Sequence, residues 1–238
     1  MKWQILALQL FPQGHDIVEH NYFLCGTAKV AEQTVAVIGT TGHTSIGVEI
    51  ALAQANAILD TLRNFPARPI VILVDTQGQR LRYRDEMLGI NRYMAHLGKC
   101  IDVARRRGHT VIGLVYDQAL SGGFITSGLM ADACYALPEA EIRVMGLAAM
   151  SRITKVPLER MTELAASNPV FAPGAENYLN MGGLEAIWDG DLEQCLARAL
   201  QQADSIDHRS ARGLERGGRK MSLPVTKLVL GTRDVLPT

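Results

Sequence analysis

Two stretches decide the fold: PIVILVDTQGQR, residues 69–80, and HTVIGLVYDQALSGGF, residues 109–124. In each, an unbroken apolar run predicts a strand buried on both faces, and a polar, glycine-containing loop follows it. Between them, apolar residues at three- and four-residue spacing predict one long helix from Asp85 to Arg107, which Gly108 ends. Two successive strand-to-helix crossovers predict an α/β fold with a mostly parallel sheet and helices outside.

The flanking sequence extends this pattern in both directions. Residues 22–30 and 33–40 predict two paired strands, followed by an Ala-rich helix that starts near Ile46 and ends before Pro66. Beyond residue 132 the pattern predicts short strands at 133–137 and 141–144, then helices near 157–166, 175–181 and 191–204.

We therefore expect one domain over residues 1–204, with a helical carboxyl-terminal part, and a basic, Gly-rich linker or tail over 205–238. Within it, residues 207–220 carry a local charge of +3. A solvated linker is the simpler interpretation of this charge, and binding to an acidic partner is the functional interpretation.

Composition excludes several classes of protein. The chain has 238 residues, with 24 Lys+Arg against 24 Asp+Glu, so no net charge attracts nucleic acid or an anionic membrane. No apolar run approaches the roughly 18 residues that span a bilayer, and the apolar start, residues 3–11, is a poor signal peptide. The four cysteines form no CxxC pair, so we expect free thiols in a reducing cytoplasm and no zinc site.

The glycines after the two strands are the main candidates for chemistry. Carboxyl ends of parallel strands gather ligands, and the backbone amides of Gly122 and Gly123 would lie unpaired at a helix start, where negative charge is favoured. If the two strands are neighbours, the amides of Gly78 and Gln79 face the same cleft. A pair of glycines needed only for tight packing is the alternative.

The side chains near these loops leave alternatives open. Arg80, Arg82 or Arg84 could meet a carboxylate, or all three could form a solvated basic face. Asp75 fits a cap better than a catalytic acid. Ser121 lies outside any G-x-S-x-G elbow, so we expect it to bind substrate rather than to act as a nucleophile.

Other familiar site patterns are not suggested. His43, in Thr-Gly-His-Thr-Ser, is a possible site residue, but the histidines have no metal-ligand spacing. With no HExxH and no phosphate-binding GxxxxGK[ST] loop, the sequence predicts no metal catalysis.

The run from Pro69 to Leu137 resembles the crotonase-type carboxyltransferase subunits. In them an apolar strand ends in Asp-Thr-x-Gly, and a later strand ends in a Ser-Gly-Gly turn before a helix and an Ala-Asp strand. Over nearly the whole length, including GTTGHTSIGVEIALAQANAIL (39–59) and ASNPVFAPGAENYLNMGGLEAIW (166–188), the chain is similar to the gamma subunits of biotin-independent malonate decarboxylase.

This resemblance implies a ClpP/crotonase fold of repeated ββα units and a homologous beta subunit as partner. Together they would decarboxylate a malonyl thioester, carried on the CoA-derived prosthetic group of an acyl carrier protein, to the acetyl thioester. A transferase subunit would then reload malonate, with no biotin and no metal bound. Such chemistry needs amide donors where the thioester enolate oxygen becomes negative.

The resemblance leaves the roles within the site open. In related biotin-dependent enzymes this type of subunit faces biotin, so Gly122 and Gly123 could hold the departing carboxylate or the thioester oxygen, or could only shape the pocket. Gln79, Tyr83, Ser121 or water could supply the proton. Two rival functions are a non-catalytic scaffold subunit of the same complex and a stand-alone acyl-CoA crotonase, against which the lack of Glu in both loops counts.

Overall fold

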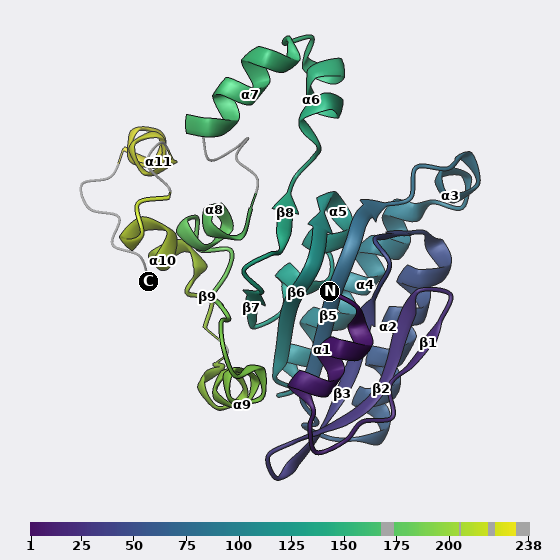
Figure 1. Ribbon diagram of the computed structural model, residues 1–238. Coiled ribbons are helices and arrows are strands. Elements are labelled where there is room, and N and C mark those ends of the chain that lie inside the picture. The colour runs from purple at the N-terminus through teal and green to yellow at the C-terminus, as the bar shows by residue number, and fades with distance from the viewer. Residues whose placement is uncertain (168–173, 205, 219–221, 232–238) are drawn as a thin grey trace.

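The computed structural model describes residues 1–167, 174–204, 206–218 and 222–231. Within them one nine-stranded sheet has the order β1-β2-β3-β5-β6-β7-β9, with β4 added to β5 and β8 added to β6 (Figure 1). β1–β2 and β2–β3 are antiparallel, and the other pairs are parallel. The predicted α/β class with a mostly parallel sheet is confirmed.

The strands are β1 Val18–His20, β2 Phe23–Val30, β3 Gln33–Thr40, β4 Thr44–Ile46, β5 Ile70–Gln79, β6 Val111–Leu120, β7 Ala133–Ala136, β8 Glu141–Arg143 and β9 Ala186–Ile187. The helices are α1 Trp3–Leu10, α2 Val48–Asn64, α3 Tyr83–Met87, α4 Ile90–Arg106, α5 Ser121–Ile125, α6 Leu147–Thr154, α7 Leu158–Ser167, α8 Ala175–Asn180, α9 Leu192–Gln202, α10 Arg209–Glu215 and α11 Ser222–Leu230, with a short 3-10 turn at Gly128–Met130.

The alternation of side chains along the central strands divides the core into two layers. In β5, Ile70 and Ile72 pack with α2 and α4 on one face. Val71 and Leu73 pack with α1 and α9 on the other face. Both faces are therefore covered, which is why these strands are apolar without interruption.

Both central strands run further than the sequence predicted. Thr76–Gln79, expected in a loop, continues β5 because β4 pairs with it. Gln118–Leu120 likewise continues β6 because β8 pairs with it. The partners that extend the two strands are distant in sequence, so the local pattern could not reveal them.

The prediction of one long helix from Asp85 to Arg107 is wrong. The helix is broken into α3 and α4 at Gly89, which adopts a left-handed backbone with φ of +75°. Met87, expected on the buried face, is 68% exposed. The helix that opens at Ser121 is also short, since α5 ends at Ile125.

The basic segment 207–220 is only partly a tail. Its residues 219 and 220 lie outside the described residues, as do 168–173 of the stretch that carries the family resemblance and 232–238 of the carboxyl terminus. Arg209 and Arg216 of the described part donate to backbone carbonyls of the domain, including those of Leu129 and Leu184, and Arg212 forms an ion pair with Glu185. These arginines dock α10 against the domain, so this helix is not a solvated linker. Binding to an acidic partner stays a prediction.

No helix within the described ranges combines the length and the apolar character that crossing a bilayer would require.

Candidate functional site

The end of β5 and the start of α5 are packed against each other through glycines. Gly78 has φ of +103°, and a Cβ there would lie 2.9 Å from the Cβ of Ser121. A Cβ on Gly123 would lie 3.0 Å from the Cα of Gly78. Because this is a backbone atom, it could move away only if the chain itself shifted. The two loops predicted to share a cleft are therefore in direct contact, and glycine at these positions permits it.

Two hydrogen-bond donors of the second loop meet at one oxygen of the first. The hydroxyl of Ser121 donates to the side-chain Oε1 of Gln79 at 3.1 Å, and the Gly122 N–H donates to the same atom at 3.1 Å. Ser121 adopts a left-handed backbone with φ of +54°, an unusual conformation for a residue other than glycine. We call this pair of donors and the oxygen between them the oxygen site.

The other predicted amide donors are placed differently. The Gly78 N–H donates to Oγ1 of Thr76 at 3.0 Å, so it is engaged within its own loop. Gln79 is paired with Ile46 of β4 in the sheet. Gly123 is buried against Gly78. The side chain of Gln79 and the N–H of Gly122 are thus the parts of the two loops that meet.

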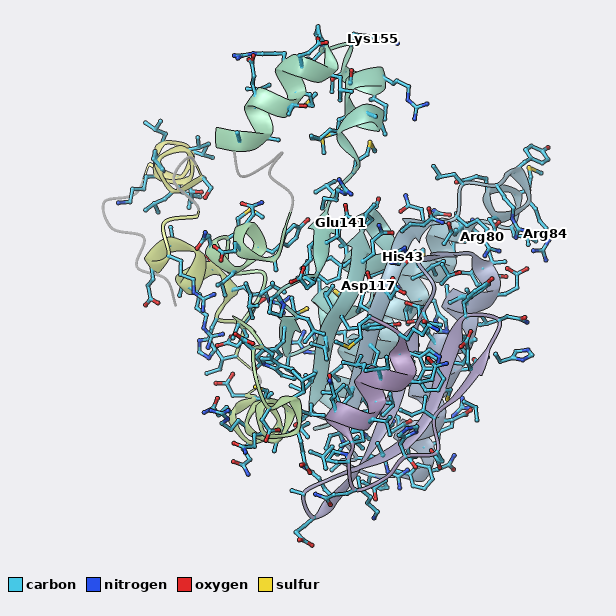
Figure 2. All side chains as sticks on the ribbon, viewed as in Figure 1. His43, Arg80, Arg84, Asp117, Glu141 and Lys155 are labelled. Carbon is cyan, nitrogen blue, oxygen red and sulfur yellow. The ribbon has the colours of Figure 1, made fainter. Side chains whose placement is uncertain are left out.

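The three arginines of the first loop are not equivalent. Arg82 donates to the buried Asp85 at 2.7 Å, and this bond holds the pKa of that carboxyl below its usual range. Arg84 pairs with Glu49, whose pKa its hydrogen bond lowers. Arg80, which directly follows Gln79, forms no ion pair with any carboxylate of the described residues (Figure 2).

Asp75 acts as an organiser of the strand ends. Its carboxylate accepts from the backbone N–H of His43 at 3.0 Å and of Gln118 at 3.4 Å. Burial raises its pKa, while the His43 N–H opposes this rise. Asp75 therefore caps two loops, in line with the simpler of the two interpretations.

His43 extends this cap into a small cluster, and Figure 2 shows it beside Asp117. Its Nε2 lies 3.0 Å from Oδ1 of Asp117 and 3.5 Å from Oδ1 of Asp75. Among the described residues, these three side chains place ligand atoms within 4.8 Å of one another, close enough to hold a metal ion. The expectation that no metal takes part stays a prediction.

Sequence reasoning missed two residues beside the oxygen site. Thr76 donates its hydroxyl to the Thr44 carbonyl at 2.7 Å and accepts from Gly78, which fixes the loop that carries Gln79. Arg143 of β8 pairs in register with the residue before Ser121, and its buried Nε has no hydrogen-bond partner. The Thr of Asp-Thr-x-Gly was a local signal, whereas no local signal marked Arg143.

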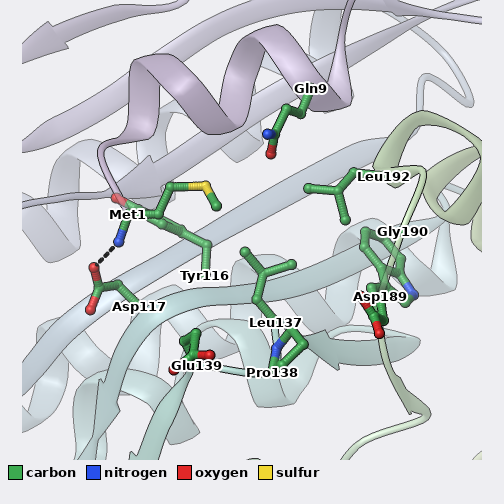
Figure 3. Close-up of a pocket in the computed structure, with 11 residues that line it drawn as sticks. Met1, Gln9, Tyr116, Asp117, Leu137, Pro138, Glu139, Asp189, Gly190 and Leu192 are labelled. Atoms are coloured by element: carbon green, nitrogen blue, oxygen red, sulfur yellow. Dashed lines mark hydrogen bonds and ion pairs between the residues drawn. The ribbon is translucent and has the colours of Figure 1, made fainter.

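A pocket of about 240 Å³ lies away from these loops, against α1 (Figure 3). Tyr116, Asp117, Leu137 and Trp188 are among its lining residues, whereas none of the glycines, Gln79, Arg80 or Ser121 contributes to it. The pocket is thus distinct from the oxygen site, although Asp117 of the His43 cluster lines it.

Comparison with known proteins identifies the family and relatives of this chain. The chain matches the family described as the malonate decarboxylase gamma subunit over residues 41–233. A relative from Malonomonas rubra, malonyl-S-ACP:biotin-protein carboxyltransferase MADD, is 29% identical over 227 residues, which cover 82% of this chain and 78% of the relative.

Solved structures share the fold. A Pseudomonas malonate decarboxylase hetero-tetramer in complex with coenzyme A contains a chain with a TM-score of 0.80 and 24% identity, covering 95% of this chain and 97% of that one. A chain of the Pseudomonas MdcD–MdcE hetero-dimer has a TM-score of 0.76 and 23% identity, covering 95% of this chain and 96% of that one. Transcarboxylase 12S has a TM-score of 0.69 and 19% identity, covering 84% of this chain and 40% of the transcarboxylase chain.

The sheet topology and these structural matches give the chain the crotonase fold that the sequence predicted. Because the family match spans most of its length, the chain belongs to the malonate decarboxylase gamma subunit family.

Proposed function

We propose that this chain is the gamma subunit of a biotin-independent malonate decarboxylase. With a homologous beta subunit it converts malonyl-S-acyl carrier protein to acetyl-S-acyl carrier protein, and a transferase subunit exchanges acetyl for malonyl. The thioester is carried on the CoA-derived prosthetic group of the carrier protein, and the complex is cytoplasmic. The single observation that carries the catalytic part is the convergence of Ser121 and Gly122 on one oxygen, each at 3.1 Å.

The oxygen site fits the chemistry of decarboxylation. When the bond between the α-carbon and the carboxylate breaks, its electron pair moves toward the thioester carbonyl and carbon dioxide leaves. Two donors aimed at one oxygen stabilise the enolate that forms. A proton then adds to the α-carbon and gives the acetyl thioester, with no side-chain nucleophile needed.

In this proposal the amide oxygen of Gln79 marks the position of a substrate oxygen. Its distances to both donors are those of an accepted hydrogen bond. Substrate would displace it and receive the same two donors. Arg80, next along the chain and without an ion-pair partner among the described residues, would bind the malonyl carboxylate before it leaves.

The test is release of carbon dioxide from malonyl-S-acyl carrier protein by this chain alone, by the beta subunit alone and by both, with avidin added to each. We expect activity only in the mixture, unaffected by avidin. Full activity of the beta subunit alone would make this chain a scaffold. Activity that requires an added biotin protein and that avidin abolishes would favour carboxyl transfer to that protein, the reaction in the name of the Malonomonas rubra relative.

A variant examines the role of Gln79 within the active mixture. Gln79→Ala removes the internal oxygen, so we expect a lower KM with little change in kcat. A fall in kcat without a change in KM would show that Gln79 supports the transition state instead.

A further inference from the structure

The segment from Leu81 to Leu88, here called the α3 knob, exposes large apolar side chains directly beyond the candidate site. Leu81 is 81% exposed, Tyr83 82%, Met87 68% and Leu88 46%. Single exposed apolar residues are ordinary, but four within one short segment form a patch. Figure 1 shows α3 at the end of a loop that stands away from the sheet.

The knob is nevertheless held in place by buried charge. Asp85 is fully buried and accepts from the Val48 N–H at the start of α2 at 3.1 Å and from Arg82 at 2.7 Å. Arg84 pairs with Glu49 of α2. The apolar side chains are therefore carried on a fixed support, which lowers the entropy lost when a partner binds.

These ion pairs also select the kind of partner. The two basic residues of the knob are paired with Asp85 and Glu49, so besides these pairs and Glu86 its exposed side chains are apolar. Permanent subunit interfaces are the more apolar class, whereas a partner held mainly by charge needs unpaired side chains of opposite sign. The chemistry of the patch favours a permanent protein partner.

We propose that the α3 knob is the docking element for the homologous beta subunit, an inference that rests on the proposed function. Leu81 follows Gln79 by two residues, so a subunit seated on the knob lies next to the strand end that carries the oxygen site. Assembly would thereby complete the site and exclude water from it.

The experiment measures binding and turnover separately. Leu81→Asp and Met87→Asp each place a charge in the patch, and Leu8→Asp on α1, where the side chain is 67% exposed, is the matched control. Melting temperature of each free chain reports folding. Affinity for the purified beta subunit is measured by titration, and carbon dioxide release from malonyl-S-acyl carrier protein is measured on the mixtures.

We expect both knob variants to melt like the unchanged chain and to bind the beta subunit at least about 30-fold more weakly, as loss of an interface hot spot does. Leu8→Asp should bind normally. Equal binding by all variants, equal weakening by Leu8→Asp, or self-association through the knob in place of beta binding would each overturn the proposal. If the unchanged pair binds through the knob but releases no carbon dioxide, the proposed function fails and the docking proposal holds.

Discussion

The ends of β5 and β6 show how neighbouring parallel strands of equal length can be given opposite tasks. Each strand has ten residues, and glycines lie at the end of β5 and in the helix that follows β6, at the same edge of the sheet. After β6 the chain turns inward at Ser121 and Gly122, and α5 packs against the sheet. After β5 the chain turns outward into the α3 knob. The inward turn positions donors, and the outward turn presents a surface.

The physical difference between the two ends lies in what holds them. The inward turn depends on close backbone contact, with Gly123 against Gly78. The outward turn depends on charge, with Asp85 bridging Arg82 and the start of α2. Substitutions at the inward turn should therefore act through steric clashes that displace the backbone. Substitutions at the outward turn should act by removing charge interactions.

The largest effect is expected from Gly123→Val. The added side chain would meet the backbone of Gly78 within 3.0 Å, so α5 must shift and carry the donors out of place. We expect decarboxylation by the mixed complex to fall about 1000-fold or more, since each lost donor costs about 100- to 1000-fold. Overpacking should also destabilise the fold by about 1–3 kcal/mol.

The matched control for that variant is Gly146→Val, where a Cβ meets no atom within 4 Å. Rates and melting curves of both variants are compared. If Gly123→Val retained full activity, the close contact of the two loops would be irrelevant to catalysis.

Ser121→Ala should have the next largest effect, because it removes one of the two donors and leaves the Gly122 N–H. We expect kcat to fall by about 100-fold, the lower end for loss of an oxyanion donor. Ser151→Ala provides the control, since its hydroxyl donates to the Val156 carbonyl at 2.7 Å within the α6–α7 region. Steady-state kinetics that gave a raised KM with unchanged kcat would assign Ser121 to substrate binding only.

Arg80→Ala should act on binding more than on turnover. A charged hydrogen bond contributes about 1.5–3 kcal/mol, which corresponds to a rise in KM of about 10- to 150-fold. Arg84→Ala is the control, because its exposed pair with Glu49 should contribute little. The KM of each variant for malonyl-S-acyl carrier protein shows whether Arg80 binds the substrate. Similar KM values for the two variants would mean that Arg80 is only part of a solvated basic face.

The smallest effect is expected from Asp85→Asn, measured as stability against pH. Arg82 holds the pKa of Asp85 below its usual range, so the carboxylate stabilises the fold at neutral pH. This contribution is lost as the pH falls below about 4, through the ordinary aspartate pKa toward the lowered one. We expect the variant to be about 1–3 kcal/mol less stable at pH 7, with the difference shrinking in acid.

Urea unfolding at pH 7 and at pH 3 tests this prediction. A difference that stays constant between the two pH values would show that the charge of Asp85 is not what anchors α3. Binding of the beta subunit by the same variant then reports whether the anchor matters for docking.

Much of the fold followed from local sequence patterns. The hairpin of β2 and β3, the apolar centres of β5 and β6, and the helix α2 all lie where periodicity predicted them. Their residues are buried on predictable faces, so the pattern and the environment agree. The break at Gly89 was missed because apolar spacing continues across it from Met87 to Ile90, while the anchor that turns α3 outward lies on α2.

The candidate site was predictable to a lesser degree. The glycines at the strand ends and a group of three arginines could be singled out from the residues, since glycine at a strand end and a cluster of cations have a direct physical meaning. Which of three arginines lacks a carboxylate partner depends on Glu49 and Asp85, and this required the structure. The role of Gln79 changed for the same reason, because its partner Gly122 lies 43 positions away and could not be assigned from spacing.

By itself, the sequence determined a mostly parallel α/β sheet and the two loops in which chemistry could occur, because apolar runs, periodicity and glycine act over a few residues. Only the tertiary structure decided that Ser121 and Gly122 share one oxygen, that Arg80 lacks a carboxylate partner among the described residues, and that the residues after it project outward. Those features depend on contacts between residues some 35 to 43 positions apart, such as Val48 with Asp85 and Gln79 with Gly122. Such contacts leave no local periodicity, so they become visible only when the chain has folded.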